Sequence, residues 1–247
     1  QSRSSAASDV YKRQLLGSVL NPLALPLLAA VQDQPAAFER RVRLCNAVFA
    51  LAAGVVVVPL LLCAPWLLER VYGPQYDVAA GVFVWLVSAR MVWFLRVAPT
   101  LTAMARADTR NALLANAFRL AGVGLALLVA ALGYALAAIG VAALVGEMVA
   151  AVAAIVMVRS RHQVSFRATI LPMFALLLAY AVAFALRDWF AGHRPQAVLA
   201  ASAALVLLLV GLMVLLVPVL RPELGRAFAA VRGRAPCRPP LLSRTLP

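Results

Sequence analysis

The stretch CNAVFALAAGVVVVPLLLCAPWL, residues 45–67, contains no charged side chain. A helix needs about 20 apolar residues to cross the hydrocarbon core of a bilayer, so this stretch is long enough to span a membrane. The whole chain of 247 residues is 64% hydrophobic and only 13% charged. Such a composition lies outside the range of a soluble protein, whose surface must be hydrated. We therefore expect a membrane protein.

Similar apolar blocks follow one another along the rest of the chain. They are rich in Ala, Leu and Val, and they lack the alternating pattern of membrane strands. The sequence therefore predicts an all-α fold, a polytopic helical membrane bundle with about seven transmembrane helices. The predicted spans are residues 15–31, 45–67, 78–104, 111–131, 134–158, 168–186 and 196–220.

The arginines outside these spans are divided unequally between alternate loops. One set of loops, together with the C-terminal segment, holds 14 arginines, whereas the other set holds only Arg70, Arg187 and Arg194. Because cytoplasmic loops carry an excess of basic residues, we place the larger set and the C-terminus in the cytoplasm. This topology explains the net charge of +14 without a nucleic-acid partner. The larger set is Arg40, Arg41, Arg43, Arg106, Arg110, Arg159, Arg161, Arg167, Arg221, Arg226, Arg232, Arg234, Arg238 and Arg244.

The two ends of the chain differ from the predicted bundle at residues 15–220. Residues 1–14, QSRSSAASDVYKRQ, contain the only lysine, Lys12, and no initiator methionine. We interpret them as a non-native leader on a protein that begins further upstream, with a native polar leader as the alternative. Residues 221–247 are basic and Pro-rich without hydrophobic periodicity, so we predict a disordered cytoplasmic tail that favours anionic headgroups.

Four charged residues lie inside the predicted spans: Arg90, Arg96, Arg119 and Glu147. Each costs about 2.5 to 3.5 kcal/mol at the centre of a membrane helix, so each needs a partner, water or a function. Arg90 lies at the middle of its span, whereas Arg96 and Arg119 lie at similar depth nearer the cytoplasmic end. Since the fourth and fifth spans form a hairpin, Arg119 and Glu147 differ in depth by about 1.5 Å.

These depths leave two interpretations open. In the first, Arg119 and Glu147 form a structural ion pair, and Arg96 extends toward cytoplasmic water. In the second, Arg90, Arg96 and Arg119 line a hydrated cavity whose counter-ions arrive with an anionic substrate, because guanidinium groups bind phosphate through paired N–H donors. Pro99 is a candidate kink beside this site, with Thr100 available to satisfy the freed backbone.

The loops contain no pattern typical of an enzyme. They hold no carboxylate pair, metal-ligand cluster or Gly-rich phosphate loop, so we expect no catalytic residues, metal or cofactor. Cys45, Cys63 and Cys237 are widely separated and are interpreted as small apolar residues. The segment DQPAAFERRVR, residues 33–43, predicts a short interfacial helix that begins with Asp33 as its cap.

In their order along the chain, several motifs resemble the C-terminal half of polysaccharide biosynthesis flippases. These motifs are NPLALPLL (21–28), FERRVR (38–43), LERVYGPQYDVAA (68–80) and the run ARADTRNALLANAFRLAG, which begins at residue 105. The resemblance covers about residues 18–160, and its most specific parts are the YGPQY turn and the run around Asn116 and Arg119. The family belongs to the multidrug/oligosaccharidyl-lipid/polysaccharide exporter superfamily.

The resemblance implies the second lobe of a flippase with 12–14 helices that moves an undecaprenyl-diphosphate-linked oligosaccharide outward across the bacterial cytoplasmic membrane. It also implies a missing N-terminal lobe of the same protein as partner, with a polysaccharide polymerase or glycosyltransferases as further candidate partners. Arg90, Arg96 and Arg119 are then candidate cavity cations, and Glu147 with Arg119 a candidate ion pair or coupling pair. The alternatives are a cation-coupled multidrug exporter and a membrane scaffold for polysaccharide-synthesis enzymes.

Overall fold

The computed structural model describes residues 15–73, 75, 77–190, 194–218 and 220–222. In this part of the chain the long elements are all α-helices, which confirms the predicted all-α fold. The helices are α2 (Leu15–Ala29), α3 (Pro35–Tyr72), α4 (Asp77–Met104), α5 (Thr109–Ala131), α6 (Leu136–His162), α7 (Phe166–Phe190) and α8 (Pro195–Leu216). The predicted leader, residues 1–14, and nearly all of the predicted tail lie outside the described residues.

Six of the described helices, α3 to α8, are long and apolar enough to cross a membrane, and the chain is a multi-pass membrane protein. The remaining helix, α2, overlaps the first predicted span but contains 15 residues, fewer than the roughly 20 of a full crossing. Each of the other predicted spans falls largely within one helix.

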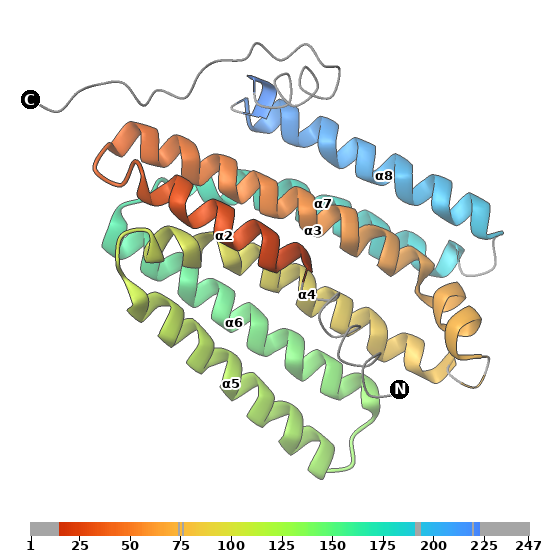
Figure 1. Cartoon of the computed structure of the whole chain (residues 1–247). Helices are drawn as coiled ribbons and strands as arrows, with labels where there is room; N and C mark the ends of the chain where they lie inside the picture. Colours follow the sequence, from red (N-terminus) through yellow and green to blue (C-terminus); the bar gives the residue numbers. More distant parts are fainter. Residues whose placement is uncertain (1–14, 74, 76, 191–193, 219, 223–247) are drawn as a thin grey trace, which may run out of the picture.

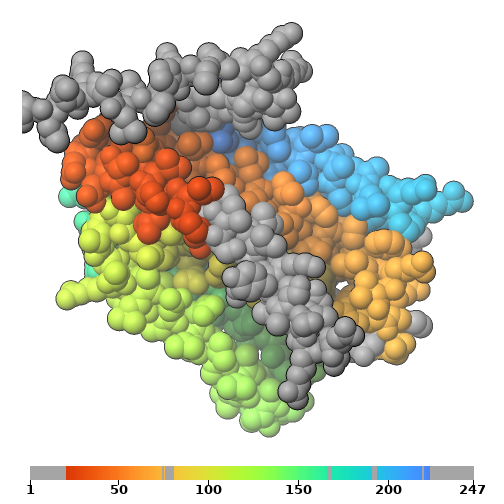
Figure 2. Space-filling model, viewed as in Figure 1, coloured from red at the N-terminus to blue at the C-terminus, as the bar shows by residue number. Residues whose placement is uncertain are grey.

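The helices lie side by side, with α5 at one edge and α8 at the other (Figure 1). From α5 inward, the order of packing is α6, α4 and α3, and α7 packs behind α3. The helix α8 rests on α3 and α7, and α2 covers α3 and α4. In the space-filling view α5 forms the outer edge of the bundle (Figure 2). The centre is therefore α3, while α5 is the least buried of the six long helices.

Successive helices run in opposite directions, so the connections alternate between the two ends of the bundle. The links after α2, α4 and α6 lie at one end, and those after α3, α5 and α7 lie at the other (Figure 1). We call the first end the basic end, because Arg41, Arg106 and Arg161 lie there with other arginines of the larger set. The described loops thus follow the alternation seen in the sequence.

The predicted interfacial helix at residues 33–43 is wrong as a separate element. These residues are continuous with the following span in α3, a single helix of 38 residues. Its N-cap is Gln34, which makes no side-chain capping bond, and not Asp33. Pro35 fixes a helical φ in the first turn, and no Gly or Pro interrupts the chain between residues 36 and 53, so nothing ends the helix before the apolar stretch.

The helices α5 and α6 meet through two glycines. A Cβ atom added to Gly122 would lie 2.4 Å from the Cα atom of Gly146, and one added to Gly146 would lie 2.5 Å from the Cα of Gly122. These distances are too short for any side chain, so the two backbones are in direct contact. Close contact of this kind fixes the relative position of α5 and α6 at the level of Glu147.

Candidate functional site

Arg96 is one of the few charged side chains inside the bundle. It is carried by α4 and is only 5% exposed, so it does not extend into water, contrary to one of the two sequence interpretations. Its Nη1 donates a hydrogen bond to Asn116 Oδ1 on α5 at 3.2 Å. Its Nε lies 3.6 Å from Glu147 Oε2 on α6. Arg96 therefore joins three helices.

Glu147 thus pairs with Arg96, and not with Arg119 as in the first of the two sequence interpretations. Arg96 and Arg119 both lie at a depth that allows a pair with Glu147. Depth does not give the direction in which a side chain points around its helix. In the structure α4 packs closely on α6 and only lightly on α5. This packing places Arg96 against Glu147, while Arg119 on α5 stays exposed.

The Arg96–Glu147 contact is an ion pair without a hydrogen bond between its closest atoms. Both Arg96 Nε and Glu147 Oε2 are buried, and neither has a hydrogen-bond partner within the described part of the chain. Buried polar atoms are almost always hydrogen-bonded, because an unsatisfied one costs about 1 to 3 kcal/mol. The pair therefore has unused hydrogen-bonding capacity at its centre.

Arg90 and Arg119 complete the group around Glu147. Both are exposed on the surface of the chain, and the charges of both, together with that of Arg96, act on the Glu147 carboxylate. The charge of Arg119 also acts on Arg96. We call Arg90, Arg96, Arg119 and Glu147 the arginine cluster. With three cations and one anion, it carries a formal charge of +2.

The cluster lies well inside the bundle along the helix axes. Arg90 is 14 residues from the end of α4 at Met104, or about 21 Å at 1.5 Å per residue, and Arg96 is about 12 Å from that end. The structure thus brings together the four charged residues that the sequence singled out. It places one cation in the interior and two at the surface of α4 and α5.

Pro99, the predicted kink, lies within α4, which remains a helix from Asp77 to Met104. The hydroxyl of Thr100 donates to the carbonyl of Arg96 at 3.0 Å. Pro99 has no N–H, so the carbonyl of Leu95 loses its usual helical donor. Thr100 bonds the next carbonyl along the chain, and the predicted compensation by Thr100 therefore does not occur. The hydrogen bond instead ties Thr100 to the backbone of the buried arginine.

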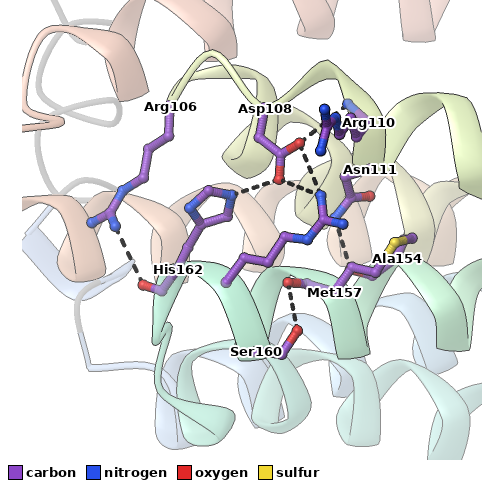
Figure 3. A network of polar contacts seen from close by, with 9 residues as sticks. Arg106, Asp108, Arg110, Asn111, Ala154, Met157, Ser160 and His162 are labelled. Atoms are coloured by element: carbon purple, nitrogen blue, oxygen red, sulfur yellow. Dashed lines mark hydrogen bonds and ion pairs between the residues drawn. The ribbon is translucent and has the colours of Figure 1, made fainter.

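A second polar group lies at the basic end, where α4, α5 and α6 meet. Its centre is Asp108, whose side chain points toward His162 and the nearby cations (Figure 3). Arg161 Nη1 donates to both carboxylate oxygens at 3.3 Å, and His162 Nε2 donates to Oδ2 at 3.1 Å. The backbone N–H of Arg110 donates to Oδ1 at 3.1 Å, so Asp108 is also the N-cap of α5.

Arg106 connects this group to α3. Its Nη1 donates to the backbone carbonyl of His162 at 3.3 Å, and its guanidinium carbon lies 4.4 Å from the centre of the Phe38 ring, within the range of a cation–π interaction. We call Arg106, Asp108, Arg161 and His162 the basic-end network. It joins the N-terminal part of α3 to the ends of α4, α5 and α6.

The environment of Asp108 favours its charged form. Partial burial opposes ionisation, but the hydrogen bonds from His162 and Arg161 and the charge of Arg161 outweigh it. Together they hold the pKa of the Asp108 carboxyl below its usual value. This network was not predicted from the sequence, because its partners are 53 and 54 residues apart. The signal that could have found it is an N-cap aspartate in one loop together with a basic helix end in the next loop at the same end of the bundle.

The structure offers no candidate metal centre among the residues that it describes, where no group of three or more His, Cys, Asp and Glu side chains could hold an ion. Cys45 and Cys63 are buried, free thiols, and Cys237 lies outside the described residues.

The arginine cluster is thus the candidate functional site, and the basic-end network a second polar group of the same three helices. Comparison with known proteins adds no assignment, because no family model, no curated protein and no solved structure matches this chain.

Proposed function

We propose that this chain is part of a flippase that moves an undecaprenyl-diphosphate-linked oligosaccharide across the bacterial cytoplasmic membrane for the synthesis of a surface polysaccharide. The observation that carries the proposal is the arginine cluster, in which Arg96 pairs with Glu147 inside the bundle and the charges of Arg90 and Arg119 also act on that carboxylate. The sequence motifs that resemble polysaccharide flippases support the same function.

The charge of the cluster favours an anionic substrate. Each charged side chain at the centre of a membrane helix costs about 2.5 to 3.5 kcal/mol, and Glu147 compensates only one of the three arginines. A diphosphate group supplies negative charge and several acceptor oxygens, which match the N–H donors of guanidinium groups. A multidrug exporter of cationic compounds would instead require an excess of carboxylates at this site.

The positions of Arg90 and Arg119 suit a site shared with a second lobe. Both side chains are exposed on the surface of this bundle, whereas guanidinium groups at membrane depth face protein or a water-filled cavity in working transporters. We propose that a first lobe of the same protein covers this surface, so that the cluster lines the cavity between the two lobes. The undecaprenyl chain would remain in the lipid while the diphosphate and saccharide pass through.

The test is made in a bacterium whose surface polysaccharide depends on this gene. Arg90→Gln and Arg119→Gln are introduced separately into the chromosomal copy, and Arg110→Gln serves as control because Arg110 is exposed at the first turn of α5, outside the cluster. We expect the two cluster variants to lose at least about 90% of the surface polysaccharide, with protein abundance unchanged, and the control to retain it. Full polysaccharide in both cluster variants would contradict the proposal.

A further inference from the structure

We propose that Glu147 is an internal counter-ion that occupies Arg96 while the site is empty and is displaced when the diphosphate of the substrate binds. The inference rests on the proposed function, since it requires an anionic substrate at the arginine cluster. In this role the Glu147 carboxylate competes with the substrate for Arg96 and sets how tightly the site binds the substrate. The net charge of the cluster alone does not imply such a role.

The geometry of the ion pair supports a replaceable contact. Arg96 Nε and Glu147 Oε2 are 3.6 Å apart, too far for a good hydrogen bond, and both atoms lack a hydrogen-bond partner within the described residues. A phosphate oxygen at normal hydrogen-bond distance from Arg96 Nε would satisfy a buried donor that Glu147 leaves unsatisfied. The exchange therefore gains a charge-assisted hydrogen bond while it gives up a longer contact.

The other contact of Arg96 keeps its guanidinium in place during such an exchange. Arg96 Nη1 donates to Asn116 Oδ1 at 3.2 Å, and this hydrogen bond does not involve Glu147. Asn116 is uncharged, so it orients the guanidinium without neutralising it. Arg96 is thus held by one neutral partner and balanced by one charged partner, and only the charged partner must leave.

The displaced carboxylate has other cations within reach. The charges of Arg119 and Arg90 already act on Glu147, and both arginines have exposed side chains. Glu147 therefore does not become an isolated charge when it leaves Arg96. A diphosphate that links a lipid to a saccharide carries two negative charges, equal to the formal charge of +2 on the cluster, so the occupied site is neutral.

Removal of the competing charge should strengthen binding. The attraction between Arg96 and Glu147 is strengthened by the low dielectric constant of the protein interior, and the substrate must overcome part of it when Glu147 is present. We expect Glu147→Gln to bind undecaprenyl diphosphate about tenfold tighter than the parent chain. Glu147→Asp, whose carboxylate is withdrawn by one methylene but keeps its charge, should show a smaller gain of about threefold.

The experiment uses the full chain in nanodiscs that contain undecaprenyl diphosphate at graded amounts, and bound lipid is measured by native mass spectrometry. Glu39→Gln is the matched control: it removes one negative charge from a half-buried i,i+4 pair with Arg43, away from the cluster. Arg119→Gln tests whether the lipid binds at the cluster. A thermal unfolding curve of each variant in the same nanodiscs establishes that it is folded, and Glu147→Asp replaces Glu147→Gln in the comparison if the latter is not.

The result that supports the inference is tighter binding in Glu147→Gln, unchanged binding in Glu39→Gln and weaker binding in Arg119→Gln. Equal or weaker binding in both Glu147 variants, with weaker binding in Arg119→Gln, would overturn the counter-ion role but leave the anion site and the proposed function in place. An equal gain in lipid affinity in Glu39→Gln would also overturn the counter-ion role. The gain would then result from the change in net charge and not from the position of Glu147. Binding that no cluster variant changes would overturn both proposals.

Discussion

Asp108 and Glu147 are both carboxylates among cationic side chains on the same three helices, but their contacts differ. Asp108 receives hydrogen bonds from Arg161, from His162 and from the backbone N–H of Arg110. Glu147 makes one ion pair at 3.6 Å, and its closest oxygen has no hydrogen bond within the described part of the chain.

The difference shows how two groups of similar composition serve different purposes. In the basic-end network every hydrogen-bonding direction of the carboxylate is used, and the cations hold the ends of neighbouring helices together. In the arginine cluster the cations exceed the anion, and the central contact is incomplete. The first arrangement stabilises the fold, whereas the second leaves charge and hydrogen-bonding capacity for a ligand.

The largest expected effect on stability comes from the centre of the basic-end network. Asp108→Ala removes the N-cap of α5, worth about 1 kcal/mol, and also the charge-assisted hydrogen bonds to Arg161 and His162, worth about 1.5 to 3 kcal/mol. We expect a loss of roughly 2 to 3 kcal/mol in the free energy of unfolding, measured by denaturation of the purified chain in detergent micelles. A loss below 0.5 kcal/mol would show that the network does not hold the helices together.

A smaller effect is expected from acid. The pKa of Asp108 is lower in the folded chain than in the unfolded chain. Asp108 therefore contributes stability that is fully present above about pH 4, which is the ordinary pKa of an Asp side chain. This stability is lost as the pH falls through the folded pKa. The parent should therefore lose more stability below pH 4 than Asp108→Asn, which cannot titrate there. Parallel melting-temperature curves for the two proteins between pH 6 and pH 3 would contradict this expectation.

Arg106 tests the link from the basic-end network to α3. Arg106→Gln removes the cation–π contact with Phe38 and the hydrogen bond to the carbonyl of His162. We expect a loss of about 1 kcal/mol in the free energy of unfolding. Arg110→Gln, at an exposed site on the same end, should stay within about 0.5 kcal/mol of the parent in the same denaturation assay. Equal losses in both variants would assign the effect to net charge.

The smallest effect on stability is expected at the arginine cluster itself. The double variant Arg96→Met with Glu147→Met replaces a buried, incompletely bonded ion pair by apolar side chains, which is often neutral or stabilising. We expect a stability within about 1 kcal/mol of the parent, together with loss of undecaprenyl diphosphate binding in nanodiscs. A destabilisation as large as that of Asp108→Ala would mean that the cluster serves the fold.

The fold was largely predictable from the sequence, because hydrophobic length alone determines where membrane helices lie. The break predicted between residues 33–43 and the next span was wrong, since charge marks the interface but does not end a helix. At the site, the sequence identified the charged residues and their depth. It could not identify the partner of Glu147, because that depends on how α4 packs against α6. Nor could it identify the contact of His162, whose side chain is only 12% exposed beside Asp108.

The contact between Gly122 and Gly146 has a mechanical consequence. Since the two backbones touch, α5 and α6 can be treated as one rigid body that carries Asn116, Arg119 and Glu147. Arg96 belongs to α4, outside that body. The sliding of α4 along the α5–α6 pair is then a coordinate that changes the distances from Arg96 to Asn116 and to Glu147 together. A spin label on α4 and another on α6 would read out that coordinate directly as an interhelical distance.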